Sequence, residues 1–199
     1  MKYPKKFRDL IECFESFPGI GPKTAERLAF FSINKQNKDT SMRFSDVLKD
    51  AVSSICECEI CGMIADEAKC EICKDDARDN NKLMIVENSK DVISFEKTNA
   101  YKGRYHVLNG LISPTNGVGP DDISIDKLTK RFENEHFDEI IIATSSTIDG
   151  EITAMYINKL LASKNIKTYR IGYGLPVSTD IEYVDEITLI KSLESKKEM

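Results

Sequence analysis

Five of the six cysteines lie within eighteen residues of one another and form two Cys-x-x-Cys pairs. The pairs are Cys58/Cys61 and Cys70/Cys73, with eight residues between them. Two such pairs that face each other supply four sulfurs in a tetrahedron, which is the coordination that zinc prefers at structural sites. The surrounding segment 51–78 is too polar to bury a core of its own. The sequence therefore predicts one structural zinc ion per chain, held by these four cysteines.

Two alternatives to this zinc site stay open at the level of sequence. The cysteines can instead form a disulfide or a redox pair, although the chain has neither a secretory signal nor the strand–helix context of a redox motif. Cys56 can replace Cys58 as a ligand, although its spacing to Cys61 fits the pattern less well.

A Pro-Gly-Ile-Gly-Pro turn at residues 18–22 separates two stretches with helical spacing of apolar residues, 7–17 and 23–32. A polar loop over 34–41 and a third helix over 44–55 should follow. Two helices joined by a glycine-containing turn are the pattern of a helix-hairpin-helix. In this motif, unpaired backbone N–H groups at the start of the second helix bind phosphate. Gly19 and Gly21 would let a phosphate approach, and Lys23 and Arg27 would contact neighbouring phosphates. The alternative is a purely structural turn between packed helices.

The second half of the chain alternates short apolar runs with helical patterns. This alternation predicts an α/β fold with a parallel sheet covered on both faces. The expected strands are 83–86, 105–108, 139–144 and 167–171, the expected helices are 90–96, 125–136 and 150–164, and 185–190 is either a fifth strand or the start of a terminal helix. Ligands of such sheets gather at the carboxyl ends of the strands, here at Glu87, at Asn109-Gly110 and at 145–151.

This layout resembles the Toprim domain of topoisomerases, primases and related nucleases. The resemblance implies a glutamate after the first strand, here Glu87, and an Asp-x-Asp after a later strand, which together hold magnesium. Ser145 and Thr147 stand at the Asp-x-Asp positions, and hydroxyls cannot replace two anionic ligands. Glu87, Asp149 and Glu151 remain as a weak magnesium site or a protein-binding site. Asp149 and Glu151 can alternatively serve only the start of a helix, where anions are favoured.

The order of these parts resembles the RecR family of bacterial recombination mediators over nearly the whole chain. The motifs that carry the resemblance are 17–29, Cys70-Glu-Ile-Cys73, 103–110, 117–122, 170–176 and 185–189. It implies a helix-hairpin-helix region over 1–55, a four-cysteine zinc finger over 56–79, a Toprim domain over 80–176 and a C-terminal assembly segment over 177–199. The missing Asp-x-Asp is normal in that family, so we expect no enzyme activity.

The resemblance also implies a function and partners. The protein would be a ring or clamp, a tetramer or dimer of dimers, that binds DNA without sequence preference. It would act with RecO and RecF to load RecA on single-stranded DNA coated by the single-strand-binding protein, in recombinational DNA repair. Residues 1–49 hold ten Lys or Arg against six Asp or Glu, which favours the N-terminal end as the DNA-binding surface although the whole chain has a net charge of −5. Reduced cysteines, no membrane span and no signal sequence favour the cytoplasm.

Two other classes of protein compete with this interpretation. One is a metal-dependent nuclease or primase that uses Glu87, Asp149 and Glu151, and the hydroxyls at Ser145 and Thr147 count against it. The other is a zinc-stabilised scaffold without a nucleic-acid role, whose hairpin mediates self-association. A salt titration of DNA binding separates the scaffold from the mediator.

Overall fold

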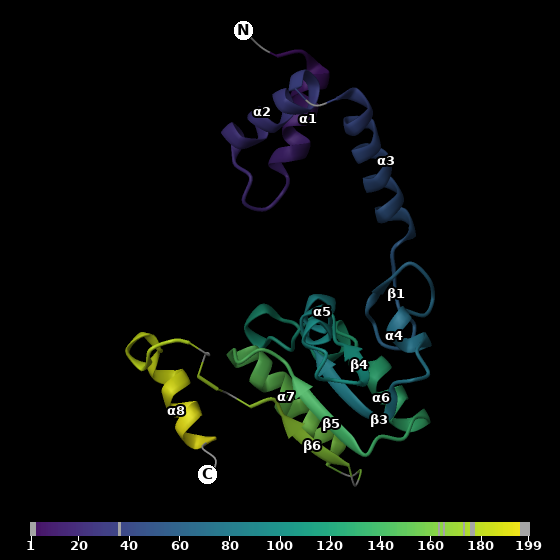
Figure 1. The fold of residues 1–199 in the computed structure, drawn as a ribbon, viewed down its shortest axis with the longest axis vertical. Coiled ribbons are helices and arrows are strands. Elements are labelled where there is room, and N and C mark those ends of the chain that lie inside the picture. The colour runs from purple at the N-terminus through teal and green to yellow at the C-terminus, as the bar shows by residue number, and fades with distance from the viewer. Residues whose placement is uncertain are drawn as a thin grey trace. The chain divides into compact units, whose positions relative to one another are not determined.

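The computed structural model of this chain describes residues 3–35, 37–162, 164, 166–172, 174–175 and 178–195. The chain divides into two compact units, Met1–Ile55 and Cys56–Met199 (Figure 1). No helix in these described ranges is both long enough and apolar enough to cross a lipid bilayer.

The first unit is helical, as predicted. Its elements are α1 (Lys5–Glu15), α2 (Pro22–Phe30), a π-helical turn (Phe31–Lys35) and α3 (Lys38–Ser54). Helices α1 and α2 pack against each other, and the rings of Phe7 and Phe30 lie 4.6 Å apart between their centroids. Ala25 and Ala29 of α2 are fully buried at this contact. The turn 18–22 joins the two helices.

The predicted polar loop over 34–41 is wrong for most of its length. The π-helical turn occupies its first residues, and α3 begins at Lys38, six residues before the predicted start at Phe44. Asn37 caps this helix, because its side-chain oxygen accepts a hydrogen bond of 3.0 Å from the backbone N–H of Asp39. The polar residues that suggested a loop are therefore the exposed first turns of a helix.

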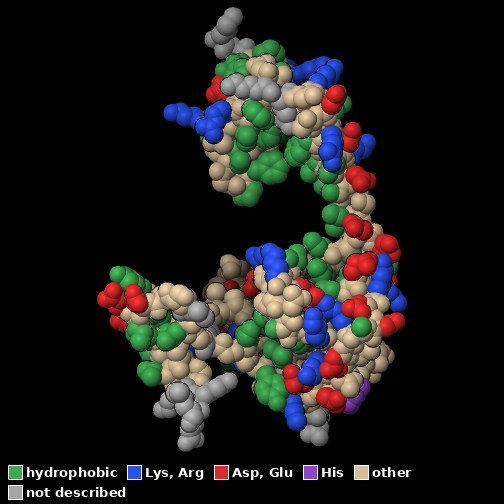
Figure 2. Space-filling model, viewed as in Figure 1, with side chains coloured by type: hydrophobic (Ala, Val, Ile, Leu, Met, Phe, Trp, Pro, Cys, Tyr) green, Lys and Arg blue, Asp and Glu red, His purple; other side chains and the backbone are tan. Residues whose placement is uncertain are grey.

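Helix α3 carries apolar side chains that its own unit does not bury. Phe44, Val47, Leu48, Val52 and Ile55 are all exposed, with Val52 at 78%. Their spacing places them along one side of the helix. Figure 2 shows apolar side chains gathered on the surface of this unit, over the hairpin and α3. Contiguous exposed apolar side chains usually mark a contact with another molecule.

The second unit begins with the cysteine segment and continues into an α/β layer structure. The cysteine segment contains a small antiparallel pair, β1 (Cys56–Glu57) with β2 (Ile64–Ala65), and the short helix α4 (Glu71–Lys74). Four parallel strands follow in the order β4-β3-β5-β6. The strands are β3 (Asp79–Val86), β4 (Gly103–Val107), β5 (Glu139–Ala143) and β6 (Lys167–Arg170). The predicted α/β fold with a parallel sheet is confirmed.

Both faces of this sheet are covered, as the continuous apolar runs predict. Helices α6 (Ile125–Asn134) and α7 (Ile148–Leu161) cover one face, where Leu83 and Ile140 are buried. Helix α5 (Ser89–Thr98) and part of the cysteine segment cover the other face, where Met84 and Val86 are buried. Successive residues of β3 therefore point into two different cores.

The chain ends in a helix, α8 (Glu186–Glu194), so of the two alternatives for residues 185–190 the helix is correct. Asp185 caps it by accepting a hydrogen bond of 2.9 Å from the backbone N–H of Thr188. The remaining helical turns are short 3-10 segments at Pro114–Asn116, Pro120–Asp122 and Ile181–Tyr183. The boundary expected between 176 and 177, Tyr173 of the 170–176 motif and the last four residues lie outside the described residues.

Candidate metal centre, nucleic-acid interface and sheet edge

The four cysteines of the two Cys-x-x-Cys pairs come together in one cluster. The sulfurs of Cys58, Cys61, Cys70 and Cys73 all lie within 4.8 Å of one another, and the first three residues are buried. All four are free thiols, so neither pair is a disulfide. Cys56 is exposed and lies outside the cluster, on the small β1–β2 pair.

Backbone turns after each pair aim the sulfurs at one another. Gly62 closes the first turn with its N–H on the carbonyl of Cys58 at 2.9 Å, and its φ of +75° favours glycine. In the second pair, the N–H of Cys73 donates to the carbonyl of Cys70 at 3.0 Å. The N–H of Cys70 also donates to the sulfur of Cys58 at 3.4 Å, which ties the two turns together.

The chemistry of this cluster suits a soft divalent cation. The sulfurs of Cys61 and Cys70 are 3.5 Å apart, and their hydrogen bond raises the pKa of the Cys61 thiol and lowers the pKa of the Cys70 thiol. Four buried thiolates would repel one another strongly, and a metal ion between them removes that repulsion. The donor set therefore fits a tetrahedral four-sulfur site, which leaves no open position for water.

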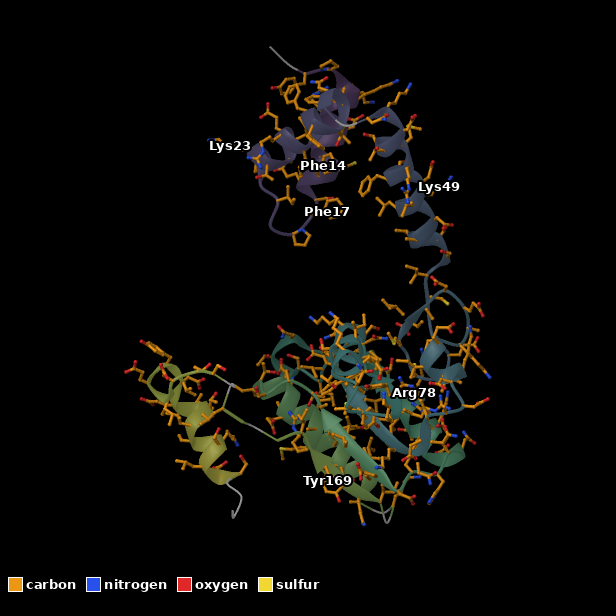
Figure 3. All side chains as sticks on the ribbon, viewed as in Figure 1. Phe14, Phe17, Lys23, Lys49, Arg78 and Tyr169 are labelled. Carbon is orange, nitrogen blue, oxygen red and sulfur yellow. The ribbon has the colours of Figure 1, made fainter. Side chains whose placement is uncertain are left out.

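The cysteine segment is attached to the parallel sheet by side chains from both parts. Arg78, labelled in Figure 3, donates hydrogen bonds of 3.0 Å to the carboxylate of Glu96 on α5 and to the carbonyl of Gly103. Asn109 donates from its amide nitrogen to the carbonyl of Gly62 at 3.0 Å and to Glu57 at 2.9 Å. The cluster and the sheet thus form one connected structure.

The hairpin turn has the open backbone that phosphate binding requires. Gly19 has a φ of +81°, which favours glycine, and the N–H of Ile20 closes the turn on the carbonyl of Phe17 at 3.1 Å. Gly21 caps α2 with an ordinary φ of −86°, and Pro22 occupies the first helical position. A Cβ built on either glycine would meet no atom of the protein within 4 Å. The space in front of this helix start is therefore accessible.

Two cations of α2 follow this opening, Lys23 in its first turn and Arg27 in its last turn. Lys23 and Arg27 are four residues apart on one side of the helix, and both are exposed. Figure 3 shows Lys23 extending outward from the start of α2, whereas Lys49 lies on α3. The structure therefore places Gly19, Gly21 and Lys23 at the start of α2, whereas Arg27 lies in the last turn of that helix.

Glu87 and Ser145 lie at the same edge of the parallel sheet. Val86 and Ala143 are register partners in β3 and β5, so the residues that follow them leave the sheet side by side. Glu87, Asp91, Thr144 and Ser145 line a shallow pocket of about 190 Å³ there. The two carboxylates come from the end of β3 and from α5, whereas Thr144 and Ser145 come from the loop after β5.

Asp149 and Glu151 do not line this pocket, because they belong to the first turn of α7 behind the loop. Glu151 forms an ion pair of 3.0 Å with Arg170 of β6. The hydroxyls of Ser145 and Thr147 are 2.9 Å apart, and Thr147 caps α7 by accepting from the N–H of Gly150 at 3.2 Å. Within the described residues, the four cysteines form the one set of three or more His, Cys, Asp or Glu side chains whose ligand atoms converge.

Sequence reasoning assigned no role to Arg170 or to Asp91. Arg170 is the last residue of β6, and the sequence Lys-Thr-Tyr-Arg of this strand carries no signal of the contacts that the arginine makes. Asp91 lines the pocket, and it also accepts a hydrogen bond of 2.8 Å from the N–H of Asn88 in the capping box of α5. The spacing of Asn88 and Asp91 at a helix start is the sequence signal that would have predicted Asp91 to cap this helix.

Three family models match the chain. A Toprim domain model matches residues 81–172, a model described as "RecR, helix-hairpin-helix" matches residues 7–52, and one described as "RecR, C-terminal" matches residues 174–197. Among curated proteins, recombination protein RecR of Streptococcus thermophilus is 47% identical to this chain over 199 residues, the full length of both proteins. The same protein from strain CNRZ 1066 of that species gives the same identity and coverage.

Proposed function

The chain belongs to the RecR family of recombination proteins, and from that membership we propose that it is a non-catalytic clamp that loads RecA on single-stranded DNA. In this proposal it forms a ring, a tetramer or dimer of dimers, and acts in the cytoplasm with RecO and RecF. It reaches RecA and the single-strand-binding protein indirectly. The family membership itself places the chain in recombinational DNA repair.

The open hairpin is the observation that supports DNA binding most directly. The helix start at Gly21–Lys23 presents backbone N–H groups and the positive end of the α2 dipole to an accessible space. Lys23 and Arg27 would then neutralise neighbouring phosphates of one strand. Such contacts hold a backbone without reading bases, so binding would be independent of sequence.

Zinc is the ion we propose for the four-cysteine cluster, one per chain. Four sulfurs at mutual distances within 4.8 Å match a tetrahedral zinc site, and zinc is the usual ion for this donor set. The bound ion would stiffen residues 56–79, which lie between the proposed DNA-binding region 1–55 and the proposed Toprim domain 80–176. Residues 177–199 would serve assembly.

The carboxyl edge of the sheet is the surface we propose for a protein partner. Glu87 offers a half-buried carboxylate beside Asp91 and Ser145, and Asp149 and Glu151 extend the acidic surface along α7. A basic side chain of RecO or RecF would complement this edge. Phosphoryl transfer would need several carboxylates that converge on metal ions, and among the described residues Asp91 is the one other carboxylate that lines the pocket with Glu87.

The proposal is tested by reversing the two hairpin charges. Lys23→Glu with Arg27→Glu should abolish binding of single-stranded DNA and RecA loading, while metal content and oligomer size stay unchanged. In each of the single variants Lys23→Ala and Arg27→Ala, the plot of log affinity against log salt concentration should become shallower, its slope smaller in magnitude by about 0.7–0.9.

The matched control reverses two cations of α3, Arg43→Glu with Lys49→Glu, which changes the net charge by the same amount. If DNA binding depends only on total charge, both double variants will lose affinity equally. If the hairpin is only structural, the Lys23/Arg27 variant will bind as the wild type does. Either result would refute the clamp.

A further inference from the structure

Arg170 reaches from the edge strand β6 to the backbone of the neighbouring strand β5 and the loop that follows it. Its Nη1 donates to the carbonyl of Ile142 at 2.9 Å. Its Nη2 donates to the carbonyls of Thr144 and Ser145 at 2.8 and 2.9 Å and to the carboxylate of Glu151 at 3.0 Å. Three backbone oxygens and one carboxylate therefore surround a single guanidinium.

The same loop is held from a second direction by Gly150 of α7. A Cβ at Gly150 would lie 2.0 Å from the carbonyl oxygen of Ser145, so the loop backbone rests directly on the helix. The hydroxyl of Thr144, which is buried, donates to the carbonyl of Gly150 at 2.8 Å. The carbonyl of Ser145 is thus fixed between a glycine on one side and an arginine on the other.

This arrangement has the ligand chemistry of a cation site with an arginine as the cation. Backbone carbonyls and a carboxylate are the oxygens that a hard metal ion takes. Here the partial negative charges of the carbonyls and the full negative charge of the carboxylate face a guanidinium, which is permanently positive and covalently part of the chain. Charge-assisted hydrogen bonds from a planar guanidinium also fix the orientation of the carbonyl groups that accept them, whereas a metal ion constrains that orientation less.

We propose that Arg170 is a positioning residue that acts as an internal cation and fixes the loop 144–147 in one conformation. The carboxyl edge of the Toprim sheet is then preformed without a bound divalent ion. Arg170 contacts no ligand itself. It acts through the carbonyl of Ser145, and Ser145 lines the pocket together with Glu87.

Hydrogen–deuterium exchange of the backbone amides in 144–150 tests this role. The full-length protein is measured as wild type, Arg170→Ala and Arg170→Lys, each with and without millimolar Mg²⁺. The exchange rate in this segment should rise about tenfold or more in Arg170→Ala and by less in Arg170→Lys. Lysine keeps the positive charge but lacks the several N–H donors of the planar guanidinium. Mg²⁺ should leave the exchange of the wild type unchanged.

Arg104→Ala is the matched control. Arg104 also lies on an edge strand and donates to a backbone carbonyl, that of Ile72, and to Asn80 at 2.7 Å, but at the opposite side of the sheet. Its removal should leave exchange in 144–150 as in the wild type. Exchange of Leu83 and Ile140 in the central strands reports whether each variant is folded.

Three results would overturn the proposal. Exchange in 144–150 could stay the same in Arg170→Ala, it could rise equally in Arg104→Ala, or Mg²⁺ could slow it in the wild type. If Arg170→Ala unfolds, Arg170→Lys decides, since loss of protection across the whole sheet in that variant would assign Arg170 a global structural role. None of these measurements involves DNA, so the inference and the proposed clamp fail separately.

Discussion

The backbone N–H of Val107 donates a hydrogen bond of 2.7 Å to the carbonyl of Cys61, at the outer edge of the strand order. Val107 belongs to β4, and Cys61 is one of the four clustered cysteines. The close approach requires a glycine next in the chain, because a Cβ at Gly62 would lie 2.7 Å from the carbonyl oxygen of Val107. The cysteine turn therefore covers part of an otherwise open sheet edge.

Removal of one cluster cysteine should release the metal and expose that edge. Structural zinc in small modules contributes roughly 10–16 kcal/mol of apparent binding free energy near neutral pH. We expect Cys70→Ser to lose the zinc and to speed amide exchange at Val107. Cys56→Ser should keep both properties, since Cys56 is exposed and outside the cluster. Metal analysis and hydrogen exchange measure these outcomes. A full zinc content in Cys70→Ser, or its loss in Cys56→Ser, would contradict the assignment.

The two hairpin glycines should respond differently to alanine. Gly21 has an ordinary φ and open space around its Cα, so Gly21→Ala should fold normally but bind DNA more weakly, because the new methyl group occupies the phosphate approach. Gly19 has a φ of +81°, so Gly19→Ala should destabilise the protein by about 1 kcal/mol. Thermal unfolding and DNA titration separate the two effects. Equal DNA affinity in Gly21→Ala and wild type would show that phosphate does not approach there.

Patterns of apolar residues predicted the elements of this chain better than polar segments did. The apolar runs of β3 and β5 could only be buried strands, and the two Cys-x-x-Cys pairs could be placed because ligand spacing is local. Residues 38–41 were predicted as part of a loop because a polar first turn and a polar loop have the same composition, and the cap at Asn37 was the deciding signal. Arg170 could not be assigned, since its four acceptors come from segments that only the folded sheet brings together.

The buried histidine should make the stability of the second unit depend on pH. His106 is fully buried, its Nε2 is 2.9 Å from the carbonyl of Ser124, and its Nδ1 has no hydrogen-bond partner in the described structure. Burial, with a smaller contribution from Arg131 and Lys127, lowers the pKa of His106 to about 3. The unfolded chain binds a proton near the ordinary pKa of 6.5, and the folded chain does not. The contribution of neutral His106 to the free energy of unfolding is therefore fully present above pH 6.5, and it is lost as the pH falls from 6.5 toward 3.

Between pH 7.5 and pH 5 this difference corresponds to a loss of about 2 kcal/mol. His106→Gln should remove that part of the pH dependence, as measured by denaturant unfolding across this range. His136→Gln is the control, because His136 is the second of two histidines and is exposed. Parallel pH profiles for His106→Gln and wild type would mean that His106 is not buried neutral.

The apolar side of α3 should mediate association between chains. Val52 is 78% exposed beside Leu48 and Ile55, and an isolated chain has no partner for it within its own described unit. Val52→Glu should shift the protein toward smaller species in light scattering at micromolar concentration. Ser53→Glu introduces the same charge one residue further round the helix and should leave the assembly intact. A wild type that is strictly monomeric would remove the ring from the proposed function.

Finally, the sheet edge should support no metal-dependent chemistry on DNA. Phosphoryl transfer needs metal ions fixed between several carboxylates, because the metal neutralises charge that builds on the transferring oxygens. Glu87 shares the pocket with one other carboxylate among the described residues, that of Asp91, and Glu151 is paired with Arg170. Magnesium gives up its waters reluctantly and would gain little from so sparse a set of ligands. We expect no cleavage, relaxation or primer synthesis with Mg²⁺ or Mn²⁺, and we expect Glu87→Gln to bind DNA as the wild type does while RecA loading with RecO weakens. DNA cleavage by the wild type that requires metal and disappears in Glu87→Gln would replace the clamp with an enzyme.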